Sequence, residues 1–578
     1  MQQIIPTINI IDYTIPSNKT RQKIKVNVFS KLGTFFHFTF LVIWLIAFVR
    51  LAQLWFLETK VYSIPEFTLI TLNVFWLPVI SLYFFIYSFR QKATNPDTEP
   101  LKARLAMVTT KIPSEPLSIV QHTLLSMKSQ SYPYPYDVWL CDEDPNTETI
   151  DWCYENDIKI SCRKGNPNYF NSTHPRKKKC KEGNLMYFYD HYGYTDYDFT
   201  IQFDADHAPE INFAREVMKE FNDPKVGYVS TPSICDINLD QSWTVKARLF
   251  WEATLHGPIQ SGANDGLAPM CFGSHYSLRV KALEEIGGIG PEIAEDYTTT
   301  AMLNAYGWKG GFAGQAIAHG MGAVGIKDSM HQEYQWALVG VRASMLIIPK
   351  IYKNFTTAIK LQSLVWIFWY PALTLVTAIS LFFPLYAIIT KKDIMETNSS
   401  NFWQVYLFMN FAFVIYLIVL RFKNMLRPHN AWAMSWETMI FQVLQFPWIA
   451  IGVVDGFLQV LRGYNPFTAK KKIKITDKTN SERGIDFGYF LPHFVIIAIN
   501  LYAVLGFETS GYNIGYKWFA FISAFSYSFA CFAGSILSIK ESKGKGFINL
   551  GYIQRNYSTI LSSLVLFGLT CYALVNLI

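Results

Sequence analysis

The stretch of residues 198–209 reads DFTIQFDADHAP, and it decides the predicted fold of the polar part of the chain. A short run of strand-type, buried-type residues ends directly at Asp204 and Asp206. Similar runs occur at 105–109, 137–141 and 226–230, and the first is followed by a helical stretch through Met127. Strands alternating with helices predict a mainly parallel α/β sheet with ligands at the carboxyl ends of its strands. Two carboxylates at such an edge suit a divalent ion that also takes phosphate oxygens.

The composition places this domain in a membrane protein. Hydrophobic residues make up 51% of the 578 residues and charged residues 16%, where a soluble domain carries roughly 25% charge. The mean hydropathy of +0.14 excludes disorder and disfavours an ordinary cytosolic enzyme. The net charge of +7 lies mostly in loops and chain ends, which indicates a cytosolic membrane face and no nucleic-acid partner. Six of the eight cysteines fall in the polar stretch without a CxxC pair, which predicts a reducing compartment.

A membrane span needs about 20 largely apolar residues. Eight apolar blocks of the chain are candidate spans. They are 35–56, 67–89, 363–390, 402–420, 434–461, 487–507, 519–537 and 557–578. Basic residues before the first block predict a cytosolic N-terminus, and the polar stretch then returns to the cytosol after two spans. The block 434–461 carries five acidic or amide side chains, so we expect it to lie in the membrane interface. This leaves seven predicted spans.

The predicted organisation has five parts. They are a cytosolic N-terminus with two spans (1–90), a cytosolic domain (91–350), interfacial helices with two spans (351–462), a loop (463–486) and three final spans (487–578).

Six motifs, in order, resemble those of processive family-2 glycosyltransferases, and cellulose synthases most closely. They are Leu140-Cys141-Asp142, Lys181-Glu182-Gly183-Asn184, Phe203-Asp204-Ala205-Asp206-His207-Ala208-Pro209, Glu295-Asp296, Gln332-Glu333-Tyr334-Gln335-Trp336 and Ile473-Lys474-Ile475-Thr476-Asp477-Lys478. The chain departs from the family pattern at Ala294, where the family has Thr, at Gln335, where it has Arg, and at Ile473, where it has Phe. The resemblance implies an inserted cytosolic GT-A (Rossmann-like) catalytic domain in a multi-pass helical membrane protein, with a gating loop at 463–486.

The resemblance also implies a role for each motif. Asp296 would be the catalytic base. Asp206 and Asp204 would hold Mg2+ or Mn2+, and His207 would be a packed imidazole beside them. The nucleotide sugar would be bound by Asp142, Lys181, Asp204, Glu115, Thr476 and Lys478. The acceptor sugar would meet Trp336, Gln332, Phe272 and Glu295. Gln335 and Arg342 are candidates for the diphosphate, because Arg342 lies two helical turns after Gln335 and on the same face.

These roles predict an enzyme that polymerises sugar from a UDP donor, with glucose favoured, and secretes the β-linked polymer through its own spans. Its partners would be the UDP-sugar, the growing polysaccharide and membrane lipids, and accessory secretion subunits are left open. We expect the protein in the plasma membrane. Three alternatives remain: a hyaluronan- or chitin-type synthase using UDP-N-acetylhexosamine, a non-processive enzyme that glycosylates a lipid carrier, and a transporter or receptor with a vestigial nucleotide-sugar domain. Intact Asp142, Asp206 and Asp296 argue against the last.

Overall fold

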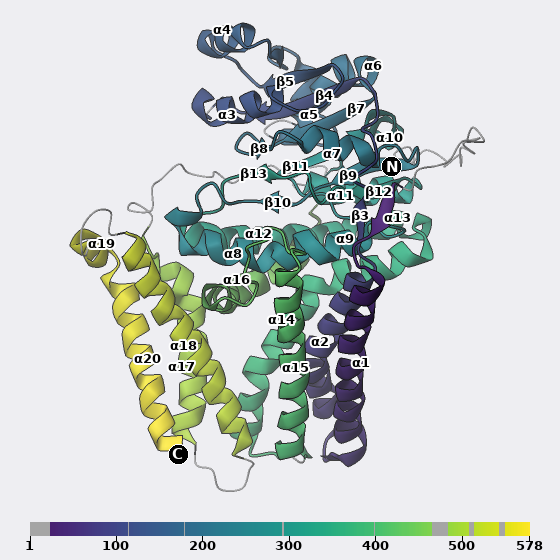
Figure 1. The fold of residues 1–578 in the computed structure, drawn as a ribbon. Helices are drawn as coiled ribbons and strands as arrows, with labels where there is room; N and C mark the ends of the chain where they lie inside the picture. The colour runs from purple at the N-terminus through teal and green to yellow at the C-terminus, as the bar shows by residue number, and fades with distance from the viewer. Residues whose placement is uncertain are drawn as a thin grey trace.

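An α/β domain sits above a bundle of long helices, with a layer of further helices between the two (Figure 1). The computed structural model describes residues 24–113, 115–177, 180–291, 294–397, 399–464, 484–507, 514–542 and 549–577. The chain enters the bundle through α1 (Lys31–Gln53) and α2 (Ile64–Phe89), builds the α/β domain, and returns to the bundle at α14 (Thr357–Thr390). The domain is therefore an insertion between membrane-type helices, as predicted.

The α/β domain is built on a seven-stranded sheet with the strand order β12-β9-β11-β7-β4-β5-β6. Its strands are β4 (Leu105–Lys111), β5 (Tyr136–Asp142), β6 (Lys159–Ser161), β7 (Phe199–Phe203), β9 (Val226–Ser230), β11 (His275–Arg279) and β12 (Lys309–Phe312). All neighbours are parallel except β11, which is antiparallel to both β7 and β9. The four predicted strands, now β4, β5, β7 and β9, are confirmed.

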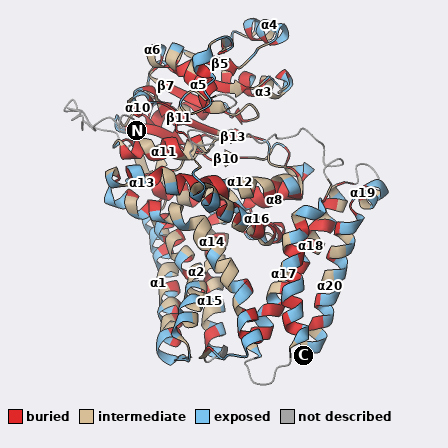
Figure 2. Cartoon of the chain, turned by 180° about the vertical axis from the view of Figure 1, so that it is seen from behind, coloured by how far each residue is buried: buried red, intermediate tan, exposed pale blue. Residues whose placement is uncertain are grey.

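Helices cover both faces of this sheet, and the side chains of its strands alternate between two cores. On β4, Leu105 and Met107 join a core with α3 (Leu117–Lys128) and α7 (Phe213–Glu220). Ala106 and Val108 join the opposite core with α5 (Lys181–Phe188), α10 (Val280–Glu285) and α11 (Glu295–Ala305). Burial on both faces explains why these strands read as continuous apolar runs (Figure 2).

Among the described residues, eight helices are long and apolar enough to cross a membrane. Besides α1, α2 and α14 they are α15 (Ser399–Phe422), α16 (Trp436–Leu461), α17 (Phe487–Gly506), α18 (Gly515–Glu541) and α20 (Tyr557–Leu577). The helix α16 is the block expected in the interface, and Figure 1 shows it nearly end-on while its neighbours run along the bundle. The predicted total of seven spans, with α16 in the interface, stays a prediction.

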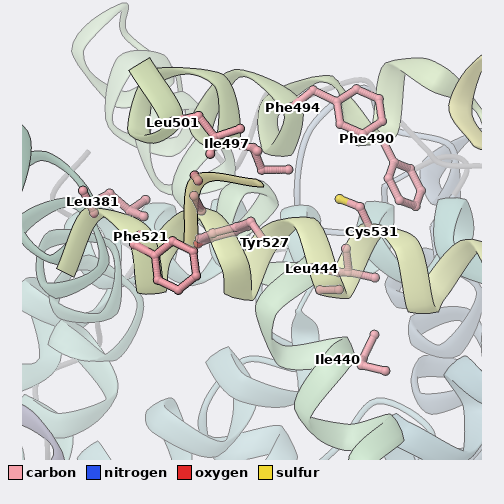
Figure 3. Close-up of a cluster of buried hydrophobic side chains, with 14 of the residues drawn as sticks. Leu381, Ile440, Leu444, Phe490, Phe494, Ile497, Leu501, Phe521, Tyr527 and Cys531 are labelled. Carbon is pink, nitrogen blue, oxygen red and sulfur yellow. The ribbon is translucent and has the colours of Figure 1, made fainter. Parts of the chain in front are cut away.

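The C-terminal helices share an apolar core with α14 and α16. Phe490, Phe494 and Ile497 of α17 pack with Phe521 and Cys531 of α18 (Figure 3). Leu381 of α14 and Ile440 and Leu444 of α16 belong to the same cluster. This packing fixes α16 against the bundle, and α16 in turn packs along α12 (Gly325–Leu346). With α8 (Trp243–Thr254), α12 forms the layer beneath the α/β domain (Figure 1).

Candidate active site

Two aspartates and a histidine gather where β7 ends. Asp204, Asp206 and His207 can bring one potential ligand atom each within 4.8 Å of one another. The carboxylate side chains of Asp204 and Asp206 are 41% and 32% exposed, so both can be reached from solvent. His207 is buried, and its Nδ1 lies 3.0 Å from Oδ1 of Asp206. The donor set of two reachable carboxylates therefore fits a hard divalent cation, with the imidazole holding Asp206 in place.

Lys181 connects this carboxylate pair to two other parts of the chain. It is the first residue of α5, and its Nζ lies 2.6 Å from Oδ1 of Asp204 and 3.8 Å from Oε1 of Glu295. The same Nζ donates to the carbonyl oxygen of Gly273 at 2.7 Å. Burial alone would lower the pKa of Lys181, but Asp204 and Glu295 raise it above its usual range. The side chain is therefore a fixed cation at the centre of the site.

Glu295 and Asp296 begin α11 on the other side of Lys181. Asp296 Oδ1 accepts a hydrogen bond from the backbone N–H of Tyr297 at 2.8 Å. A Cβ on Gly273 would lie only 3.4 Å from Asp296 Oδ2, so the loop 271–274 lies against this carboxylate. Burial raises the pKa of both Glu295 and Asp296 above the usual range for carboxyl groups. A desolvated carboxylate of raised pKa is the property that a general base needs.

Asp142 ends β5 at the same edge of the sheet. Thr109 of β4 pairs with Leu140 on one side and Phe203 on the other, so Asp142 and Asp204 leave the sheet on either side of β4, at levels that differ by one residue along the strands. Asp142 is fully buried, and its Oδ2 lies 2.9 Å from Nζ of Lys111. Glu115 lies in the turn after β4, where its Oε2 accepts from the backbone N–H of Ile112 at 3.0 Å.

The predicted acceptor residues come from α12, from the loop before β11 and from the start of α11. Trp336 and Gln332 lie one turn apart on α12, and Trp336 is 41% exposed. The ring of Phe272 stands edge-on to that of His256 at 4.5 Å. Glu295, the remaining acceptor candidate, reaches Lys181 as described above.

The two diphosphate candidates have different surroundings. Gln335 Nε2 lies 3.0 Å from Nε2 of His331, one turn before it on α12. Arg342 is buried between α12 and α16, where its Nη1 donates to Gln459 at 3.1 Å and its guanidinium lies 4.0 Å from the ring centre of Tyr464. A role of either in binding diphosphate stays a prediction. Thr476 and Lys478, with the rest of the motif 473–478, lie outside the described residues.

Sequence reasoning missed several polar residues that the fold brings to the predicted ones. Lys111 pairs with Asp142, Gly273 contacts Lys181, and Arg248 lies under Trp336. A signal existed for the first two, since Lys111 lies two residues after the predicted strand 105–109 and Gly273 directly follows Phe272, a predicted acceptor residue. Arg248 carries no such signal, because it lies 84 positions before its partner Gln332 and only the packing of α8 on α12 joins them.

Parts of this chain are similar in sequence to known proteins. Residues 200–426 match the family model described as glycosyl transferase family group 2. "Cellulose synthase 1" of Komagataeibacter xylinus is 29% identical over 168 residues, which is 28% of this chain and 11% of that protein. The UDP-forming cellulose synthase catalytic subunit of Xanthomonas axonopodis pv. citri is 26% identical over 236 residues, 39% of this chain and 30% of that protein. The chain thus spans less than a third of the length of these relatives.

Among solved structures, a mannosyltransferase of Pyrobaculum calidifontis in complex with GDP-Man and Mn2+ has a TM-score of 0.43 at 15% identity, covering 68% of this chain and 99% of that one. The family match, the sheet and the apolar helices confirm the fold predicted from the sequence. Residues 200–426 thus match a family-2 glycosyltransferase model, and parts of the chain are similar to cellulose synthases.

Proposed function

We propose that this protein is a processive, inverting β-glycosyltransferase that polymerises glucose from UDP-glucose and passes the polymer through its own membrane helices. The observation that carries the proposal is the position of Lys181, whose Nζ joins Asp204 of the reachable carboxylate pair to Glu295 beside Asp296. A fixed cation between a cation-binding edge and a buried carboxylate suits a donor with a diphosphate leaving group. The relatives named as cellulose synthases support glucose as the sugar and UDP as the carrier.

Each residue then has a task in one displacement. The acceptor hydroxyl oxygen forms a bond to the anomeric carbon of the donor while the bond from that carbon to the diphosphate oxygen breaks. Asp296 takes the hydroxyl proton, and the attack from the opposite side converts an α-linked donor into a β-linked product. Lys181 neutralises the diphosphate as its charge develops. Asp204 and Asp206 would hold Mg2+ or Mn2+, which when bound supplies further positive charge to the leaving group.

Recognition of the donor is assigned to the carboxyl edge of the sheet. Asp142, held by Lys111, and Glu115 would contact the nucleoside, since both lie at the end of β4 or β5. Thr476 and Lys478 would contact the nucleotide from the loop 463–486. Gln335 and Arg342 stay candidates for the diphosphate.

The acceptor is assigned to the layer between the domain and the bundle. The flat indole of Trp336 suits stacking on the C–H face of a sugar ring, and Gln332, Phe272 and Glu295 would surround that ring. From there the product would enter the helical bundle. We place the protein in the plasma membrane with its α/β domain in the cytosol, in contact with lipids and open to accessory secretion subunits.

Incubation of the purified protein with Mg2+ or Mn2+ and a panel of radiolabelled nucleotide sugars tests this function. We expect UDP-glucose to give a polymer of high mass that a β-1,4-glucanase or another linkage-specific β-glucanase degrades. Polymer from UDP-N-acetylhexosamine alone would support the hyaluronan- or chitin-type alternative. A labelled lipid carrying one sugar would support the non-processive alternative.

A further inference from the structure

A buried arginine lies directly beneath the indole of Trp336. The guanidinium carbon of Arg248, on α8, is 3.9 Å from the ring centre of Trp336, on α12. Arg248 is 7% exposed and Trp336 41%, so the arginine covers an inner face of a ring that solvent still reaches. At this distance the cation and the ring attract each other, and the attraction is stronger where the cation is desolvated.

Three side chains hold the guanidinium in this position. Its Nε donates to Oε1 of Glu252 at 3.0 Å, one turn along α8, and its Nη2 lies 3.5 Å from Oε1 of Glu333 on α12. Its Nη1 donates to the side-chain oxygen of Gln332. Burying an arginine costs free energy unless carboxylates and hydrogen bonds compensate it. The position of the guanidinium is therefore fixed from both helices.

The held arginine orders the acceptor side of the site. Gln332, Glu333 and Trp336 lie within about one turn of α12, and Arg248 contacts all three. An exposed indole on a helix surface can otherwise adopt several rotamers, and attraction to the fixed guanidinium favours those that keep the ring centre close to it, as at the observed 3.9 Å. A ring fixed in this way presents its remaining surface to a sugar without losing conformational freedom on binding.

We propose that Arg248, clamped by Glu252 and Glu333, is a positioning residue that holds the indole of Trp336 as a rigid platform for the acceptor sugar. The proposal rests on the proposed function, because it assigns Trp336 to the acceptor. It predicts an effect on the transfer to the polymer end and none on the donor. Lysine cannot replace arginine here, since its ammonium has neither the plane nor the fork that contacts three partners.

The experiment compares Arg248→Lys and Trp336→Ala, alone and together, in the full-length protein with UDP-glucose. Arg421→Lys is the matched control, because the guanidinium carbon of Arg421 also lies 3.7 Å from the ring centre of an indole, that of Trp432, but Arg421 belongs to the last turn of α15, away from α8 and α12. We expect Arg248→Lys to shorten the polymer and lower its rate of synthesis about tenfold, with an unchanged KM for UDP-glucose and unchanged UDP affinity. The double variant should be no worse than Trp336→Ala, and Arg421→Lys should resemble the native protein.

Native polymer length in Arg248→Lys, or a double variant whose losses multiply, would overturn the proposal. If Arg248→Lys fails to fold, Glu252→Gln loosens the same clamp at constant size, and native polymer length there would also contradict it. A second readout is independent of turnover: Arg248→Lys should change the anisotropy of the fluorescence contributed by Trp336, isolated by subtracting a Trp336→Phe variant. Absence of polymer from the native protein with every donor would instead refute the proposed function.

Discussion

The ammonium of Lys181 lies 2.6 Å from Oδ1 of Asp204, although the two residues are 23 positions apart and come from a helix start and a strand end. This contact brings the acidic pair after β7 to the cation that also reaches Glu295. The site is thus a row of alternating charge: the carboxylates of Asp204 and Asp206, the ammonium of Lys181, and the carboxyl groups of Glu295 and Asp296.

Asp296→Asn keeps the size of the side chain but removes the base. Polymer synthesis should fall at least about 100-fold, as loss of general-base catalysis typically does. Binding of UDP, measured by calorimetry, should survive, because Asp296 is assigned to the acceptor proton. Near-native turnover of Asp296→Asn would show that another group takes the proton.

Asp206→Ala should abolish polymer synthesis and metal-dependent UDP binding together, since the carboxylate would share its cation with the diphosphate. The matched control is Asp196→Ala, which removes an exposed carboxylate from the Asp-x-Asp pair 196–198, outside the row. Asp196→Ala should stay active and keep its dependence on Mg2+ or Mn2+. Full activity of the native protein in excess EDTA would exclude the metal role.

The acid limb of the pH profile of kcat/KM should lie at a higher pH than an ordinary aspartate would give. Burial raises the pKa of Asp296 and Glu295 in the fold, and a base must be deprotonated to act. Activity should therefore be lost as the pH falls through a value well above the ordinary aspartate pKa of about 3.9. A limb at or below about pH 4, measured after confirming that the protein stays folded there, would contradict the desolvated base.

Gln335→Arg should leave the protein active and tighten inhibition by UDP, because an arginine adds a permanent charge and charge-assisted hydrogen bonds are roughly twice as strong as neutral ones. Gln335→Lys separates the effect of charge from that of the planar fork. Unchanged UDP inhibition in both variants would place position 335 away from the diphosphate. In parallel, Arg342→Ala should weaken the apparent donor affinity if Arg342 compensates for the missing charge; an unchanged affinity would exclude it.

Gly452→Ala should loosen the support of α12. A Cβ at this position of α16 would lie 2.3 Å from the carbonyl oxygen of Tyr334, so the two helices must move apart. Overpacking of this kind costs about 1–3 kcal/mol, which should lower the midpoint of thermal unfolding in detergent and reduce polymer synthesis. Gly568→Ala on α20 is the control, because its added Cβ meets no atom within 4 Å. Equal melting curves for both variants would contradict the close approach.

The sequence predicted the elements of the molecule that depend only on residues close together in the chain. β4, β5, β7 and β9 are apolar runs that end in polar residues, and the long apolar helices need only composition to be found. β12 escaped prediction because its two glycines, 310 and 311, hide the strand pattern, and β6 because it has three residues. The motif residues Lys181, Asp204 and Glu295 could be named from the resemblance, but their contacts needed the fold.

The support of Trp336 shows where such prediction ends. No sequence pattern around Arg248 connects it to α12. From sequence alone, a basic residue on an amphipathic helix is expected to contact lipid phosphates. Only the packing of α8 against α12 buries it beneath the indole. Arg342 illustrates the same point, since its spacing from Gln335 is visible in the sequence while its contact with Gln459 of α16 is not.

Reconstitution into sealed vesicles measures whether synthesis is processive and coupled to secretion. With the α/β domain facing outward, UDP-[14C]glucose and Mg2+ or Mn2+ would be added outside, followed by a β-glucanase. We expect long labelled polymer inside the vesicles, protected from the enzyme until detergent is added, and no such polymer with Asp296→Asn. Labelled product that is short, lipid-linked or wholly digestible from outside would contradict it.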